Sequence, residues 1–186
     1  MDPIRDYLNA VAALLTEIPS ENIRKIAALV LDAYKTDKQI FLIGNGGSAA
    51  TASHLACDLQ KGVGHAGSKR FRVEALTDSV PLLTALANDS DYSDVFAEQI
   101  STWVQQGDLV IAISASGNSK NIIKGIELAN EKKAITIGLS GFNGGRLAQI
   151  AQHNIVVSSD DMQHIEDVHL VLAHLIYRYV LEEIAA

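Results

Sequence analysis

Twice in this chain, a short apolar stretch runs into a loop of small residues and then into a segment that favours a helix. In the first case, the apolar run 41–43 (FLI) leads into the loop 44–48 (GNGGS), and an alanine-rich segment follows. Glycine permits positive φ and close backbone approach, and a helix that begins there presents unpaired N–H groups and the positive end of its dipole. Such a loop can bind an anion, but a plain strand-to-helix turn explains this one loop equally well.

The second case favours the anion-binding interpretation. Residues 109–113 (LVIAI) are another buried-strand run, and they lead into residues 114–119 (SASGNS) before a further helical segment. Three serine hydroxyls and a glycine at a helix N-terminus form a second anion cradle. Because ligands of α/β proteins bind at the carboxyl ends of parallel strands, we expect both loops to hold one phosphate there.

Apolar strands alternate with helical segments along the chain, a pattern typical of a parallel sheet covered on both faces. We therefore predict a three-layer α/β/α fold with a five-stranded, mainly parallel sheet, built as one domain over residues 1–186. Phe96, Ile100 and Trp103 should lie on one apolar helix face, with Trp103 in the core. The predicted strands cover 39–43, 70–76, 109–113, 134–139 and 155–157, and the predicted helices cover 4–18, 23–34, 48–62, 81–86, 93–104, 119–131, 146–150 and 162–184, with a mobile loop at 63–69.

Composition excludes several classes of function. The 186 residues carry a formal net charge of −7, which argues against nucleic-acid binding, and no run of about 18 apolar residues suggests a membrane span. The first residues lack the basic and then apolar pattern of a signal peptide, and the single cysteine, Cys57, suits a reducing compartment. We therefore expect a cytoplasmic protein in which Cys57 is a buried packing residue.

Two pairs of side chains have the spacing of metal ligands on helices. His54 and Asp58 are four residues apart on the helix after the first loop, and Glu166 and His174 are eight apart on the last helix. Two imidazoles and two carboxylates could hold one divalent cation, with zinc favoured by the imidazoles. A solvated helix face is the alternative for both pairs. His169 is either a partner of this site or a surface residue.

Together, the two loops resemble those of the SIS (sugar isomerase) domain family, in the same order and separation, and the resemblance covers nearly the whole chain. Within that family, the chain is most similar to the phosphoheptose isomerases, which have His-x-x-x-Glu on the first helix and Gln-(seven residues)-His on the last. The matching residues here are His54, Asp58, Glu166 and His174. Both histidines are kept, whereas Glu is replaced by Asp and Gln by Glu.

The resemblance implies a flavodoxin-like fold and an aldose–ketose isomerase that interconverts sedoheptulose 7-phosphate and glycero-manno-heptose 7-phosphate through an enediol. It implies a zinc ion held by the four matching residues, with Asp58 or Glu166 as base and His174 as acid. It also implies a homotetramer in which the extra N-terminal helices pack against partner subunits. The residues expected to bind the sugar phosphate are Asn45, Gly46, Gly47, Ser48, Asn88, Asp89, Ser114, Ser116 and Ser119.

Two alternatives stay open at this point. Some SIS proteins bind sugar phosphates without catalysis and act as regulators, and the two carboxylate changes are compatible with an isomerase of a different sugar phosphate. The retained His174 favours an enzyme, because the regulators lack this histidine. For the pair Asn88–Asp89, an ordinary turn at the end of a helix is as good an interpretation as substrate binding.

Overall fold

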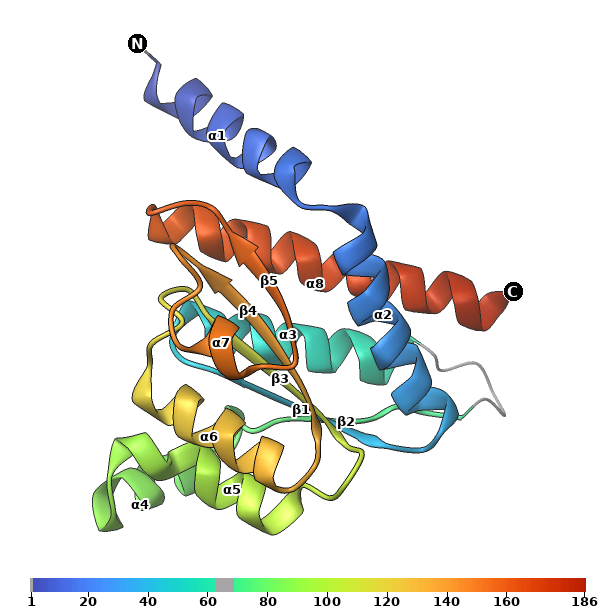
Figure 1. Cartoon of the computed structure of the whole chain (residues 1–186), viewed down its shortest axis with the longest axis vertical. Coiled ribbons are helices and arrows are strands. Elements are labelled where there is room, and N and C mark those ends of the chain that lie inside the picture. Colours follow the sequence, from blue (N-terminus) through green and yellow to red (C-terminus); the bar gives the residue numbers. More distant parts are fainter. Residues whose placement is uncertain (1, 63–68) are drawn as a thin grey trace.

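The computed structural model describes residues 2–62 and 69–186, so the loop expected at 63–69 lies outside the described residues except for Lys69. Five strands form one sheet in the order β2-β1-β3-β4-β5, and every neighbouring pair is parallel (Figure 1). The predicted five-stranded parallel sheet is confirmed. The strands are β1 (Gln39–Gly44), β2 (Arg72–Ala75), β3 (Leu109–Ser114), β4 (Ile135–Gly141) and β5 (His153–Val157).

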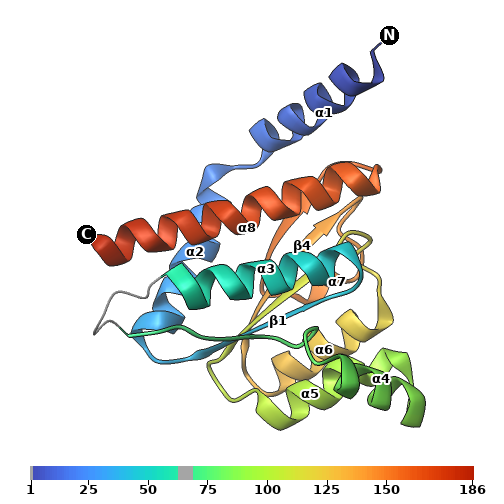
Figure 2. The same cartoon turned by 180° about the vertical axis from the view of Figure 1, so that it is seen from behind.

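Helices cover both faces of the sheet, which confirms the three-layer α/β/α architecture (Figures 1 and 2). Residues of α2, α3 and α8 form one core with the sheet, and residues of α5, α6 and α7 form the other, with α4 packed against it. The helices are α1 (Pro3–Glu17), α2 (Ser20–Lys35), α3 (Gly47–Gly62), α4 (Val80–Asp89), α5 (Val95–Trp103), α6 (Lys120–Glu131), α7 (Leu147–Ile150) and α8 (Met162–Ala185), with a short 3-10 helix η1 (Tyr92–Asp94) before α5.

Strand β1 shows how the apolar runs serve two cores. Ile40 and Leu42 belong to the core under α3 and α8, whereas Phe41 and Ile43 belong to the core under α5 and α6. Successive side chains of a strand point to opposite faces, so a strand buried on both faces must be apolar throughout. Truncating one of these fully buried side chains to alanine should cost about 2–5 kcal/mol of unfolding free energy.

The order of the strands determines where a ligand can bind. The chain runs from β1 to β2 on one side, while β3, β4 and β5 follow on the other side of β1. The loops after β1 and β3 therefore leave the sheet in opposite directions, and a crevice opens between the carboxyl ends of these two strands. These are the two loops of small residues that the sequence singles out.

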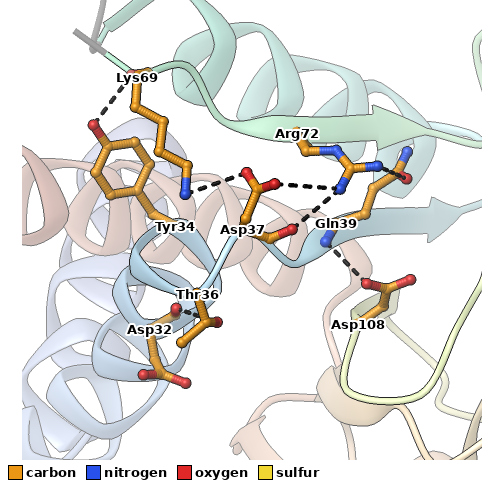
Figure 3. A network of polar contacts seen from close by, with 8 residues as sticks. All are labelled: Asp32, Tyr34, Thr36, Asp37, Gln39, Lys69, Arg72 and Asp108. Carbon is orange, nitrogen blue, oxygen red and sulfur yellow. Dashed lines mark hydrogen bonds and ion pairs between the residues drawn. The ribbon is translucent and has the colours of Figure 1, made fainter.

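A polar network lies next to the amino ends of β1, β2 and β3, at the opposite end of these strands from the two loops (Figure 3). The buried carboxylate of Asp108 accepts hydrogen bonds from the backbone N–H of Gln39 at 3.0 Å and of Gln105 at 2.8 Å. Arg72 donates to the carbonyl of Asp37 at 3.1 Å, and Lys69 pairs with the Asp37 carboxylate at 3.2 Å. These contacts fix the loops at this edge, so the polar residues there have structural partners.

Helix α1 extends away from the rest of the molecule and contacts α8 (Figures 1 and 2). It has no buried residue, and Ile4 and Leu8 are 72% and 56% exposed. The Tyr7 hydroxyl donates to the Asp167 carboxylate at 2.6 Å, and this hydrogen bond raises the pKa of Tyr7 to about 12. The first half of the apolar side of α1 is thus exposed in the single chain. In its second half, the side chains that are partly buried against the core are Val11, Leu14 and Leu15.

Two expectations about individual side chains are wrong. Trp103, expected in the core, is 56% exposed at the last residue of α5, and the next residue, Val104, is buried in that core instead. Cys57, expected to be buried, is exposed on α3. Among the described helices, none has the length and apolar character needed to cross a membrane.

Candidate active site

The first loop leads directly from β1 into α3. Gly46 has φ +54°, a conformation that costs a side-chain-bearing residue about 1–2 kcal/mol. The carbonyls of Asn45 and Gly46 accept the first hydrogen bonds of α3, from Ala49 at 3.2 Å and Ala50 at 3.1 Å. The N–H groups of Gly47 and Ser48, the first two residues of α3, have no such acceptor in the helix, and the buried Ser48 lines the crevice.

The second loop leads from β3 into α6 through a tight turn. Gly117 has φ +63°, and its N–H donates to the carbonyl of Ser114 at 2.9 Å. Ser119 stands at the N-cap of α6, yet its hydroxyl makes no capping hydrogen bond and instead faces the Ser114 hydroxyl at 3.5 Å. Two serine hydroxyls and the start of a helix are therefore directed at the same point.

A pocket of about 130 Å³ lies between the two loops. It receives the N-termini of α3 and α6, so two helix dipoles and their unpaired N–H groups converge on it. Among the described residues that line it, none is a lysine or arginine, so attraction for an anion comes from backbone and hydroxyl groups. The lining residues are Asn45, Ser48, Ile113, Ser114, Ala115, Ser116, Ser119, Met162 and Glu166.

A third loop, after β4, supports the second. A Cβ atom on Gly145 would lie 2.6 Å from the carbonyl oxygens of both Ser116 and Gly117, and one on Gly117 would overlap the carbonyl of Gly144. The N–H of Arg146 donates to the Asn118 side chain at 3.0 Å. The sequence alone does not show which loop packs against which, because these contacts join residues that are far apart in the chain.

The structure brings together three of the four predicted metal ligands. Helices α3 and α8 run side by side (Figure 2), and their ligand atoms in His54, Asp58 and His174 all lie within 4.8 Å of one another. The two Nε2 atoms are 3.0 Å apart, and Asp58 Oδ2 lies 3.3 Å from His54 Nε2 and 4.0 Å from His174 Nε2. We call these three residues the His–Asp–His group.

The His–Asp–His group fits a divalent cation. Ligands that sit 2.0–2.2 Å from a tetrahedral ion are roughly 3.3–3.6 Å apart, and the observed separations of 3.0, 3.3 and 4.0 Å lie on both sides of this range. Two imidazole nitrogens 3.0 Å apart need a proton or a cation between them, because otherwise two lone pairs would face each other. The two histidine side chains are 48% and 46% exposed, so an ion there would keep a position open to solvent or substrate.

The fourth predicted ligand, Glu166, occupies a different place. Its carboxylate lies directly over Gly47, where a Cβ would overlap it, and it lines the pocket between the loops. Glu166 is not part of the His–Asp–His group. Asn88 and Asp89 lie in the last turn of α4, both exposed, with the Asn88 amide donating to the Asp89 carboxylate at 2.8 Å, and neither lines the pocket.

His169 lies on the buried face of α8. It is 1% exposed, and its Nε2 lies 3.1 Å from the carbonyl oxygen of Ser140, at the end of β4. Burial lowers the pKa of His169 to about 4, and the hydrogen bond to Ser140 offsets only part of that effect. The surface interpretation of His169 is therefore wrong, and the neutral ring attaches α8 to the sheet one turn after Glu166.

Burial of His169 predicts a pH-dependent stability. Its pKa is about 4 in the folded chain and about 6.5 when unfolded, so the unfolded chain takes up the proton first as pH falls. Its contribution should be complete above pH 6.5 and lost between pH 6.5 and 4, by an amount on the order of 3 kcal/mol. Urea unfolding at pH 7.5 and 5.0 tests this. His169→Gln should show a smaller loss than the wild type, and an equal loss in both would contradict the assignment.

The comparisons with known proteins agree with this geometry. The family model described as "SIS domain" matches residues 6–141, and the chain belongs to the SIS domain family. This span contains both loops and the first metal-ligand pair, while α8, which carries His174, lies beyond it.

Comparison with named relatives identifies a more specific group within the SIS domain family. The chain is 37% identical to the phosphoheptose isomerase of Aquifex aeolicus, over 92% of this chain and 90% of the relative, and 40% identical to that of Sulfurimonas denitrificans, over 87% and 83%. It also resembles the solved structure of phosphoheptose isomerase GmhA from Neisseria gonorrhoeae, with a TM-score of 0.87 and 29% identity over 95% and 94% of the two chains. The chain is thus a member of the phosphoheptose isomerase group of enzymes, as the loops and histidines predicted.

Proposed function

We propose that this chain is a sugar-phosphate isomerase, acting as one SIS domain over residues 1–186, and that its substrate is sedoheptulose 7-phosphate. The observation that carries the proposal is that helices α3 and α8 contribute residues both to the anion-binding pocket and to the His–Asp–His group. The relatives' names support the choice of a heptose phosphate. A screen of C6 and C7 ketose phosphates by NMR, scored for the corresponding aldose, tests the substrate.

The geometry supports a substrate in which several carbons separate the phosphate from the reacting end. Ser48, at the pocket, and His54, in the His–Asp–His group, are six residues apart on α3, which is about 9 Å along the helix axis. With the phosphate held between the two loops, the sugar chain would lie along α3 and α8 toward His54 and His174. Remote binding of the phosphate would then orient the reacting carbons.

The residues at the reacting end of the substrate supply acid–base chemistry. In the proposed reaction, a carboxylate removes a proton from C1 of the ketose, the enediol forms, and a proton is delivered to C2 while the C1 hydroxyl becomes the aldehyde. We assign the base to Asp58, which lies beside the two imidazoles at the end of the site where C1 would lie, and the acid to His174, whereas Glu166 lines the phosphate pocket. A zinc ion bound by His54, Asp58 and His174 would supply Lewis-acid polarisation of the substrate oxygens.

A second candidate function is sugar-phosphate binding without catalysis. The observation that favours it is the placement of Glu166 beside the phosphate pocket and outside the His–Asp–His group. This protein would then bind phosphate esters and zinc and convert none of the ketoses in the screen. Conversion of any ketose phosphate would reject it, and conversion of a hexose in place of a heptose would identify a different isomerase.

We further propose that the chain assembles into a homotetramer through α1. The exposed apolar side chains of α1, Ile4 and Leu8 among them, have no place in the core of the single chain, and burying them against a partner would be favourable. Light scattering at micromolar concentration should give four times the chain mass of 20.0 kDa. Ile4→Glu with Leu8→Glu should shift the mass downward, and a wild-type monomer would contradict the proposal.

A further inference from the structure

We propose that Asn121 and Tyr92 are positioning residues that hold the two anion-binding loops at a fixed separation, so that they set the affinity for the phosphate end of the substrate. This inference rests on the proposed function and adds two residues that sequence reasoning did not single out. Neither residue lines the pocket. Both act through Asn45, which does line it.

Asn121 joins the two loops through a reciprocal amide pair. Its Nδ2 donates to Asn45 Oδ1 at 2.9 Å, and Asn45 Nδ2 donates to Asn121 Oδ1 at 2.9 Å. Asn121 lies in the first turn of α6, directly after the second loop, and is 2% exposed. Its Oδ1 also accepts the N–H of Ile122 at 3.0 Å, which fixes the orientation of the amide. The pair therefore bridges the crevice between β1 and β3.

Tyr92 holds Asn45 from the other side. Its hydroxyl donates to Asn45 Oδ1 at 2.8 Å, although the residue is 55% exposed and so gains little from packing. The short helix η1 that carries Tyr92 is attached to α6 by Lys124, whose Nζ donates to Ser93 Oγ and Asp94 Oδ1, each at 2.7 Å. Asn121 and Tyr92 thus hold Asn45 from a common support, helix α6.

Loss of the hydrogen bonds to Asn45 should weaken phosphate binding, because the loops would then be ordered only when the phosphate binds. The pocket attracts an anion with backbone N–H groups and hydroxyls, which are effective only when they are held at the right separation. Without the amide pair, the first loop would be held by its own strand and helix and by Tyr92, and the second loop by its own strand and helix and by the loop after β4. A substrate would then have to order the loops as it binds. The loss should appear in phosphate affinity and in KM, and much less in binding of a cation by the His–Asp–His group.

Isothermal titration with inorganic phosphate and with sedoheptulose 7-phosphate tests this inference. Relative to the wild type, we expect about 10-fold weaker binding in Asn121→Ala and about 3-fold weaker binding in Tyr92→Phe, as for loss of buried and exposed hydrogen bonds. Zinc affinity should change by less than about twofold in both. KM should rise by similar factors, with kcat changed far less.

Matched controls separate positioning from general destabilisation. Asn130→Ala removes amide contacts at the other end of α6, to Thr136 at 2.8 Å and to the carbonyl of Ile150 at 2.9 Å, and should leave phosphate affinity unchanged. Tyr34→Phe removes a hydroxyl bond to the Lys69 carbonyl at 3.1 Å, far from the site, and is the control for the exposed Tyr92. Tyr92→Phe keeps the test decisive if Asn121→Ala fails to fold.

A double-mutant cycle tests whether Asn121 acts through Asn45. Adding Asn121→Ala to Asn45→Ala should weaken phosphate binding by less than about twofold beyond the Asn45 variant alone. Phosphate affinity that is unchanged in Tyr92→Phe, or equally weakened in the two controls, would overturn this inference alone. A wild-type protein that binds neither phosphate nor sedoheptulose 7-phosphate would overturn the proposed function and this inference with it.

Discussion

Replacing His174 by alanine should lower kcat/KM for the ketose phosphate by a factor of about 10²–10⁴, the usual contribution of a positioned acid or base. The same change removes one of the three converging ligands, so bound zinc should fall from near one ion per chain to a small fraction. Phosphate affinity should stay within about twofold, because His174 is far along α8 from the pocket between the loops. Steady-state kinetics, metal analysis and titration with inorganic phosphate measure the three effects.

The control for this variant is His153→Ala. His153 begins β5, at the amino ends of the strands and therefore at the edge opposite the site, so its loss should leave zinc content and kcat unchanged. His54→Ala should reproduce the effect of His174→Ala on zinc content. Full zinc content in both His54→Ala and His174→Ala would show that the His–Asp–His group is not a metal site.

Gly117→Ala should have the second largest effect, on both stability and phosphate binding. The residue has φ +63°, and a Cβ there would overlap the carbonyl oxygen of Gly144. The backbone conformation costs an alanine about 1–2 kcal/mol, and displacing the neighbouring loop costs a similar amount, so the unfolding free energy should fall by about 2–4 kcal/mol. Because the second loop must move, phosphate affinity should fall at least 10-fold.

Gly107→Ala separates the two consequences. Gly107 also has positive φ, at +85°, but it lies at the opposite edge of the sheet, where a Cβ would contact only the Lys38 side chain, at 3.0 Å. This variant should lose stability without losing phosphate affinity. If Gly117→Ala weakened phosphate binding no more than Gly107→Ala does, the second loop would not be part of the anion site.

The sequence predicted those features that depend on short-range patterns. Strand runs buried on both faces can only form the middle of a covered parallel sheet, so the fold class followed from alternation alone. The position of the site at the carboxyl ends of the strands could also be predicted from the sequence. Each loop of small residues comes directly after an apolar run, as residues 44–48 do after residues 41–43. His54 and Asp58 share one face of α3 for the same local reason, their spacing of four residues.

Features that depend on packing between distant elements were not predictable in this way. Whether Glu166 joins His174 or the pocket depends on how α8 lies across α3, and the eight-residue spacing permits both. Asn121 carried no signal, since a lone asparagine in a helix has many uses, and its partner Asn45 is 76 residues away. Likewise, Trp103 follows the apolar period of α5 but is exposed, while the next residue, Val104, is buried in the core.

The proposed isomerase activity is tested most directly by an NMR measurement of sedoheptulose 7-phosphate in D₂O with the zinc-loaded protein. An enediol mechanism predicts conversion to the aldose phosphate, with solvent deuterium replacing a C1 proton of the ketose and appearing at C2 of the product. His174→Ala should slow both processes together. Zinc-loaded wild-type protein that binds the ketose phosphate but neither converts it nor exchanges its C1 protons would contradict the account.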